Sequence, residues 1–171
     1  MSSGIPVNDE CVRKYEGLKT GRLYKYVIFE MSSDYKEIVA GHRYRLRKPV
    51  EGNQSDMDIA EGDNESNTAN LVPGEQPQTE EEMYEEFLKH LPPNECRYAV
   101  YDMPATKNGV TNNKLVFISW SPDDSKIKPK MVYSSSKNDL VRKLEGIYHL
   151  VQATDADEIS FASIESKLQR I

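Results

Sequence analysis

Apolar side chains recur along the chain at two different spacings, and each spacing predicts a different kind of element. Four segments repeat an apolar residue every three or four positions, which places those residues on one face of a helix. Asn8 is placed to cap the first helix, and Thr79 with Glu82 forms a capping box at the second. The four apolar stripes are Cys11, Tyr15 and Leu18; Met83, Phe87 and Leu91; Leu140, Leu144 and Ile147; and Phe161, Ile164 and Leu168.

Segments rich in aromatic and β-branched residues predict the strands. Residues 24–31 and 35–40 flank a short Ser-Ser-Asp turn and read as a hairpin. Residues 97–103 and 114–120 are joined by a polar loop containing glycine and are expected to pair as central strands, and residues 150–153 supply a last short strand. Helices and strands therefore interleave. This order predicts an α/β fold, a single domain with a central mixed five-stranded sheet flanked by helices on both faces.

The segment from Lys130 to Ile147, KMVYSSSKNDLVRKLEGI, reads as a strand end, a serine-rich cap and a short amphipathic helix. Ser136 and Asp139 have the spacing of a capping box, and Gly146 supplies the stop. A different stripe, predicted to face outward, consists of Ser134, Asn138, Val141, Arg142 and Glu145.

Residues 50–79 differ in composition from the rest of the chain. They are rich in Glu, Asp, Asn, Ser, Gly, Gln and Pro and carry few large apolar side chains, so they are expected to form a mobile surface insertion. Seven acidic residues and no basic ones lie between 51 and 79, so the remainder of the chain is close to neutral despite a formal net charge of -6. The segment before it, from Arg43 to Lys48, is basic. It fits either an anionic-lipid or nuclear-import patch or an edge strand protected by charge.

The residue types that commonly serve in catalysis, metal binding or phosphate binding do not form a recognisable pattern in this sequence. His42, His90 and His149 stand in unrelated contexts, and neither phosphate-binding glycine motif is present, so we expect no enzyme, metal or cofactor. Cys11 and Cys96 have no metal-type spacing and are expected to be reduced core thiols. A near-neutral folded part argues against nucleic acid as a partner. With no apolar run of about 20 residues and no signal-peptide pattern, the chain is expected to be soluble and intracellular.

Five stretches, in this order, resemble the actin-depolymerising factor/cofilin family and cover nearly everything outside residues 50–79. The resemblance implies the actin-depolymerising factor homology fold. It also implies a cytoplasmic, monomeric, non-catalytic protein that binds actin monomers and filament sides, favours ADP-actin, and promotes filament disassembly and subunit turnover. The stretches are SGIPV at 3–7, LPPNECRYAVYD at 91–102, KLVFISWSPD at 114–123, KMVYSSSKNDLVRKLEGI at 130–147 with VQATD after it, and the short C-terminal helix.

The resemblance also implies which residues contact actin. The filament-side contacts would be Lys114, Lys167 and Arg170. Ser3, or the adjacent Ser2, matches the position where phosphorylation inhibits many family members, since a phosphate there would repel an acidic actin surface. Phosphoinositide headgroups bind basic residues of the long helix in the family and would mask the actin site. The implied monomer-binding residues are Ser3, Gly4, Ile5, Val7, Lys130, Met131, Lys137, Asn138, Val141 and Arg142.

Two departures from the family pattern bear on function. Asn138 stands where members often have an acidic residue, and Val141 where they often have a basic one, which weakens the electrostatic part of the helix contact and of phosphoinositide binding. The loop before Lys114 reads 111–113 Thr-Asn-Asn, where members usually have basic residues. Monomer binding and disassembly are therefore favoured over strong severing. The alternatives are a filament-side binder without depolymerising activity and a phosphoinositide-binding adaptor that uses Arg43 to Lys48, and the basic patch leaves nuclear entry open.

Overall fold

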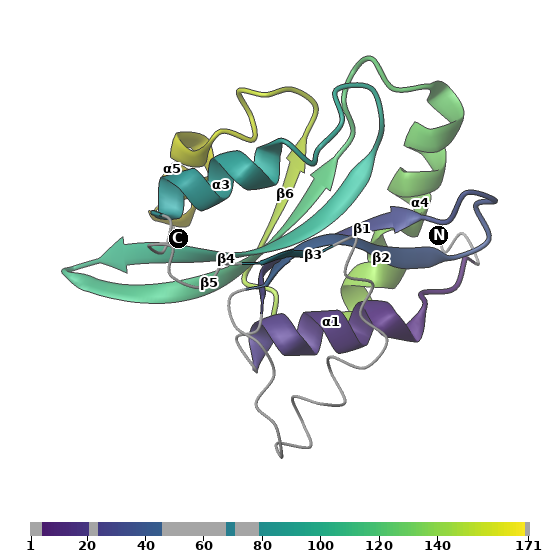
Figure 1. Ribbon diagram of the computed structural model, residues 1–171. Helices are drawn as coiled ribbons and strands as arrows, with labels where there is room; N and C mark the ends of the chain where they lie inside the picture. Colours follow the sequence, from purple (N-terminus) through teal and green to yellow (C-terminus); the bar gives the residue numbers. More distant parts are fainter. Residues whose placement is uncertain (1–4, 21–23, 46–67, 71–78, 170–171) are drawn as a thin grey trace.

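The computed structural model describes residues 5–20, 24–45, 68–70 and 79–169 (Figure 1). They form a strongly twisted sheet with helices packed on both of its faces. The elements, in chain order, are α1 (Asp9–Lys19), β1 (Tyr24–Met31), β2 (Ile38–Arg45), β3 (Thr68–Asn70), α3 (Glu80–Leu88), β4 (Arg97–Lys107), β5 (Val110–Trp120), α4 (Ile127–Lys143), β6 (His149–Ala153) and α5 (Phe161–Gln169).

The sheet is mixed and has the strand order β3-β2-β1-β4-β5-β6. The pairs β1/β2, β1/β4 and β4/β5 are antiparallel, whereas β2/β3 and β5/β6 are parallel. This confirms the predicted fold class of a mixed sheet between helices. Five strands correspond to those predicted, and the short β3 is added beside β2 from within residues 50–79, where the sequence predicts no strand. The prediction that this insertion is mobile falls mostly on residues outside the described ranges.

The β4/β5 hairpin is longer than predicted. Pairing continues without interruption from Arg97 opposite Trp120 to Lys107 opposite Val110. Asn108 and Gly109 make the turn with φ of 54° and 78°, the left-handed conformation that two-residue hairpin turns require. The hairpin therefore extends well beyond the helices that cover the sheet (Figure 1).

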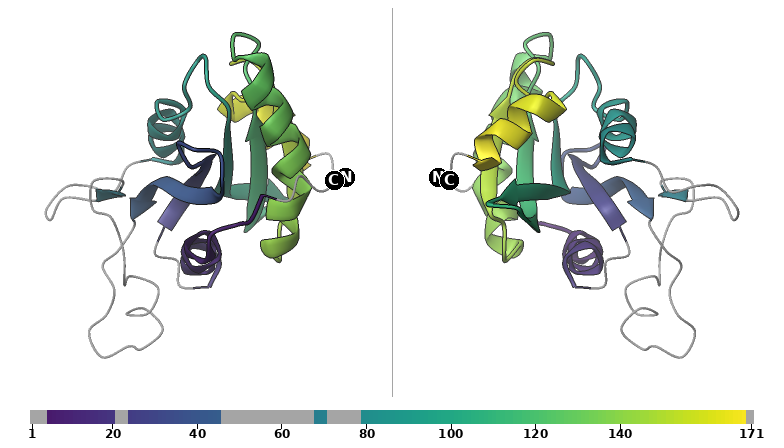
Figure 2. Two further views of the ribbon diagram at one scale, coloured as in Figure 1. Left: turned by 90° about the vertical axis from the view of Figure 1, so that its right-hand side faces the viewer. Right: turned by 90° about the vertical axis from the view of Figure 1, so that its left-hand side faces the viewer.

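Two hydrophobic cores lie on opposite faces of the sheet. Along β4, Tyr98 and Val100 point into one core, and Ala99 and Tyr101 point into the other, as the period of a strand requires. Helices α1 and α4 cover the first face, and α3 and α5 cover the second (Figure 2). The molecule thus has three layers, and α4 lies on the side of the sheet opposite α5.

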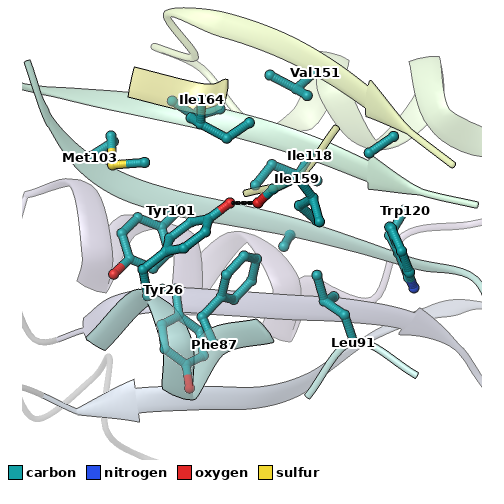
Figure 3. Close-up of a cluster of buried hydrophobic side chains, with 14 of the residues drawn as sticks. Tyr26, Phe87, Leu91, Tyr101, Met103, Ile118, Trp120, Val151, Ile159 and Ile164 are labelled. Carbon is teal, nitrogen blue, oxygen red and sulfur yellow. Dashed lines mark hydrogen bonds between the residues drawn. The ribbon is translucent and has the colours of Figure 1, made fainter. Parts of the chain in front are cut away.

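The core beneath α3 and α5 is largely aromatic (Figure 3). The rings of Tyr26 and Phe87 lie 5.0 Å apart, and those of Tyr84 and Tyr101 lie 5.1 Å apart in an edge-on arrangement. Such pairs contribute about 0.5–1.5 kcal/mol each beyond their buried area. Tyr84 was missing from the predicted stripe of α3. Tyr84 is fully buried, whereas the predicted Met83 is only half-buried. In the first turns of α3, the residue that faces the core is therefore Tyr84 and not Met83.

The predicted N-caps of α1 and α3 and the two predicted reduced thiols are confirmed. Asn8 Oδ1 accepts a hydrogen bond from the backbone N–H of Glu10 (2.9 Å), and Thr79 Oγ1 accepts one from that of Glu82 (3.1 Å). Cys11 and Cys96 are buried free thiols. Burial raises the pKa of the Cys11 thiol to about 12, so it stays protonated and unreactive near neutral pH.

Candidate binding surface on helix α4

Helix α4 begins earlier than predicted. The sequence predicts a strand end at Lys130 and a cap at Ser136, and both predictions are wrong. The N-cap is Lys126, which makes no capping hydrogen bond with its side chain. Pro129 lies in the first turn, where a backbone N–H would have no helical partner anyway. Ser136 lies inside the helix and is fully buried, facing the sheet instead of capping a terminus.

Hydrogen bonds anchor the inward face of α4 to the sheet. The Tyr98 hydroxyl on β4 donates to the backbone oxygen of Tyr133. The Tyr133 hydroxyl in turn accepts from the backbone N–H of Met31 on β1 (2.8 Å). Burial raises the pKa of Tyr133 to about 12, so its hydroxyl is neutral at physiological pH. Leu140 on α4 and Leu144 at its C-cap are buried, as predicted, but the helix ends at Lys143, before the predicted stop at Gly146, so the half-buried Ile147 lies beyond the helix.

The outward face of α4 carries exposed apolar side chains. Met131 is 66% exposed and Ile127, one turn earlier, is 77% exposed. A shallow depression beside them is lined by Lys130, Met131, Ser134, Ser135 and Asn138. The predicted outward stripe is otherwise present, except that Val141 is half-buried and packs against the core.

Basic residues are spread along α4, and Lys130 is the one that lines this depression. Lys130 Nζ donates to the backbone oxygen of Asp123 (2.9 Å), which holds its side chain toward the start of the helix. Arg142 is exposed and pairs with Asp139 one turn before it. Lys137 is half-buried. Three of the predicted monomer-binding cations therefore lie along one helix, with apolar side chains between them.

The start of the described chain lies beside α4. Backbone hydrogen bonds run from Asn8 N–H to Ile38 O and from Ile38 N–H to Pro6 O, both 2.9 Å, and tie the N-terminal segment to β2. Ile5 and Val7 are half-buried and pack against the same core as α4 (Figures 1 and 2). The structure thus brings these two predicted residues to the helix. Ser2, Ser3 and Gly4 lie outside the described residues.

The predicted filament-side residues occupy other elements. Lys114 on β5 is half-exposed, and its Nζ lies 4.4 Å from the centre of the Tyr148 ring, a cation–π contact. Lys167 is half-exposed on α5, and Arg170 lies outside the described residues. Next to Lys114, the Asn113 amide donates to the Asp102 carboxylate (3.3 Å). Lys167 lies away from the α4 surface, since α5 covers the opposite face of the sheet.

Sequence reasoning missed Ile127. The signal that could have identified it is an isoleucine between lysines in the run 126–131, KIKPKM, which a helix starting at Ile127 places one turn from Met131. Among the described residues, no group of three or more His, Cys, Asp or Glu side chains could hold a metal ion. No helix within the described ranges is both long enough and apolar enough to cross a bilayer.

Comparison with known proteins gives consistent matches over the whole chain. Residues 52–169 match the family described as cofilin/tropomyosin-type actin-binding protein. The chain is 37% identical to a cofilin of Mycosarcoma maydis, covering 99% of this chain and 98% of that protein. It is 36% identical to actin-depolymerizing factor 12 of Arabidopsis thaliana, covering 97% and 96%. The crystal structure of Streptomyces griseoflavus cofilin matches with a TM-score of 0.69 at 34% identity, covering 96% of each chain.

Proposed function

Because the chain belongs to the actin-depolymerising factor/cofilin family of actin-binding proteins, we propose that it binds actin monomers and the sides of actin filaments and promotes filament disassembly and subunit turnover. Members of this family are not enzymes. The protein therefore acts through binding energy alone, and its place of action is the cytoplasm, on the actin cytoskeleton.

The exposed apolar face of α4 is the observation that carries the proposal. Met131 and Ile127 are among the most exposed large apolar side chains of the described residues, although the opposite face of their helix is anchored to the sheet. A helix that is anchored to the sheet and presents a few exposed apolar side chains with basic neighbours suits docking into an apolar groove with acidic rims. In this proposal Met131 and Val141 contact the groove, and Lys130, Lys137, Asn138 and Arg142 contact its rims.

The N-terminal segment completes the proposed monomer-binding surface. Ile5 and Val7 are held beside α4 by packing and by the hydrogen bonds of Pro6 and Asn8 to Ile38. We assign Ser3 and Gly4 to the same surface because they directly precede Ile5. Phosphorylation at Ser3, or at Ser2, would place a dianion next to the contact and weaken binding to an acidic surface.

Disassembly follows from differential affinity. Filament subunits are taken to have two states, an ADP-like state with altered twist and the ordinary state. A protein that binds the altered-twist state more tightly shifts the filament toward it, by an amount set by the difference between the two binding free energies. Contacts between neighbouring subunits are weaker in that state, so subunits leave faster. Binding with equal affinity to both states would leave the filament unchanged.

Lys114, Lys167 and Arg170 are the proposed filament-side residues. Residues 111–113, which the sequence predicts as a loop, belong to β5, and the strand carries Asn112 and Asn113 just before Lys114, where a basic side chain would strengthen contact with an acidic filament surface. We therefore expect side binding with weak severing. Phosphoinositides remain candidate competitors for Lys137 and Arg142, with Val141 contributing no charge.

Co-sedimentation with ADP-actin filaments tests the proposal. We expect the protein in the pellet and a rise of actin in the supernatant. Binding without released actin would instead support a filament-side binder that does not depolymerise. Release without binding to the pellet would indicate sequestration of monomers.

A double variant tests the site itself. Replacing Lys130→Ala and Met131→Ala should weaken actin binding about tenfold or more, since both side chains lie at the centre of the proposed contact. The matched control removes an exposed lysine and an exposed apolar side chain elsewhere, Lys89→Ala with Leu150→Ala, and should retain full affinity. Full affinity in a folded Lys130/Met131 variant would reject the site while leaving actin binding itself intact.

A further inference from the structure

A separate hollow lies at the end of the sheet where β5 and β6 both finish. It has a volume of about 470 Å³ and an apolar floor formed by Leu88, Leu91, Trp120 and Ile159. Leu91, Trp120 and Ile159 belong to the core beneath α3 and α5 (Figure 3), so the hollow is built on the face of the sheet opposite α4. Its volume lies in the range of sites that hold a small ligand or a few side chains.

The walls of the hollow are fixed by hydrogen bonds. The Trp120 indole donates its single N–H to the backbone oxygen of Pro92 (2.7 Å), so the ring offers only apolar and π surface to a ligand. Two loops meet beside it. Ser121 N–H donates to Ala153 O (2.9 Å), and Asp123 N–H donates to Thr154 O (3.3 Å). The hollow is therefore formed in advance, and little ordering entropy is lost when it is filled.

Carboxylates from the loops after β5 and β6 line part of the hollow. Asp123, Asp124 and Asp155 are exposed and line the hollow, and its described lining contains no basic side chain. The nearby Lys130 is directed to the backbone oxygen of Asp123 and not to these carboxylates. The rim therefore favours a cation, while the floor favours an apolar group. The Trp120 ring adds a surface on which an ammonium or guanidinium group can lie.

We propose that this hollow is a docking site for a basic, apolar peptide segment of a partner protein. One bulky aliphatic or aromatic side chain of the segment fills the floor, and lysine or arginine side chains on either side pair with Asp124 and Asp155. The fixed walls select a peptide side chain of matching shape, and the carboxylates select a peptide with positive charge. The inference goes beyond the proposed contacts of α4 and the N-terminal segment with actin, and the hollow adjoins the α4 surface because the backbone oxygen of Asp123 accepts a hydrogen bond from Lys130.

Trp120 supplies the assay, because it is the only tryptophan of the chain. The probe is an amidated tetrapeptide with a central leucine–phenylalanine pair between two arginines. It should change the Trp120 emission in a saturable way, with a Kd on the order of 10–1000 µM that weakens as salt is added. Replacing both arginines by glutamate, or both central residues by serine, should abolish the change. Titration calorimetry measures the same affinities independently.

Charge-reversal variants locate the site. Asp124→Lys with Asp155→Lys should weaken peptide binding at least tenfold. The control reverses two exposed carboxylates outside the hollow, Asp157→Lys with Glu145→Lys, and should bind as the parent protein does. Urea unfolding of all variants confirms that each is folded before binding is compared.

Three results would overturn the inference: an unchanged Trp120 emission up to several millimolar peptide, equal binding by the two charge-reversed proteins, or equal binding of the glutamate peptide. A change of emission with protein concentration alone, together with dimerisation in sedimentation, would assign the hollow to a second copy of the chain instead. No actin is present in these assays, so their failure leaves the proposed function standing, and failure of the actin assay leaves this inference standing.

Discussion

Three tyrosine hydroxyls join parts of the molecule that are far apart in sequence. Tyr15 on α1 donates to the backbone oxygen of Glu145, and Tyr84 on α3 donates to that of Ile159, each at 2.5 Å. Tyr98 on β4 donates to Tyr133 O on α4. The rings fill the cores while each hydroxyl finds an acceptor on another element. A tyrosine in this position therefore contributes both apolar burial and a directional contact.

Removing one hydroxyl should cost measurable stability. In Tyr98→Phe the apolar packing of the ring is retained, but the hydrogen bond is lost, and the backbone oxygen of Tyr133 loses this buried donor. We expect a loss of about 1–2 kcal/mol in the free energy of unfolding, measured by urea denaturation. Tyr35→Phe is the control, because Tyr35 lies exposed in the turn between β1 and β2. Equal stabilities of the two variants would contradict the role given to Tyr98.

At the scale of elements, the start of α4 is the least well capped of the three helix N-termini whose caps are described. Lys126 occupies the N-cap without a capping hydrogen bond, and no acidic residue lies in the first turn. The positive end of the helix dipole is left facing lysine side chains. By contrast, α1 and α3 begin with a side-chain cap and acidic residues. The first turn of α4 is therefore expected to fray most readily.

A serine at position 126 should stabilise this terminus. In Lys126→Ser the hydroxyl can accept a backbone N–H of the first turn, and a positive charge near the dipole is removed. The free energy of unfolding should rise by about 0.5–1.5 kcal/mol. Lys128→Ser removes the same charge inside the helix, where serine cannot cap, and should not stabilise. A gain of the same size in both variants would assign the effect to charge alone.

Local signals predicted most elements because the helices and strands carry their own patterns. Asn8 and Thr79 stand directly before amphipathic stripes, and both form the expected caps. Ser136 misled the prediction because serine is common at N-caps, and only the packing of α4 on the sheet shows that this serine is buried. The short β3 has no signal of its own, since three residues become a strand only by pairing with β2.

The candidate sites were predicted unevenly for the same reason. Met131 and Lys130 were predicted from a family resemblance, and the structure adds that Met131 is exposed. Ile127 was missed because the predicted helix began too late. The hollow around Trp120 assembles residues from α3, β5 and the loop after β6, so no local pattern in the sequence could reveal it.

At the scale of the whole molecule, the insertion should be dispensable for actin binding. Its described part, β3, pairs with β2 at one edge of the sheet, and α4 packs across a different part of it. Deletion of residues 52–78 should therefore leave affinity for actin within about twofold of the parent, as measured by co-sedimentation. Loss of binding in a variant whose circular dichroism is native would make the insertion part of the contact.

The buried hydroxyls also set the alkaline limit of stability. Burial raises the pKa of Tyr15 and Tyr133 to about 12, and raises those of Tyr84, Tyr98 and Tyr101 well above the usual value of 10. Above about pH 10 the unfolded chain releases these protons while the folded chain retains them. Stability should therefore be full below pH 9 and fall above pH 10, by about 1.4 kcal/mol per pH unit for each such proton.

Urea midpoints between pH 8 and 11.5, with tyrosinate absorbance followed in parallel, measure this limit. Part of the absorbance should appear only as the protein unfolds. The Cys11 thiol acts in the same direction from about pH 9, because its pKa is also raised by burial. A midpoint that stays constant to pH 11.5, or full tyrosinate absorbance in the folded protein, would rule out the raised values.

The double anchoring of Tyr133 has a mechanical consequence. Its backbone oxygen is held from β4 and its hydroxyl from β1, while Tyr15 holds the chain just after the C-terminal end of α4. Because it is held at Tyr133 and at Glu145, the part of α4 between these residues should bend little under load. If α4 is docked on a filament that twists, the torque passes through these bonds into the sheet with little compliance. In the proposed complex, the elastic strain would then fall on the joints between actin subunits and not on α4.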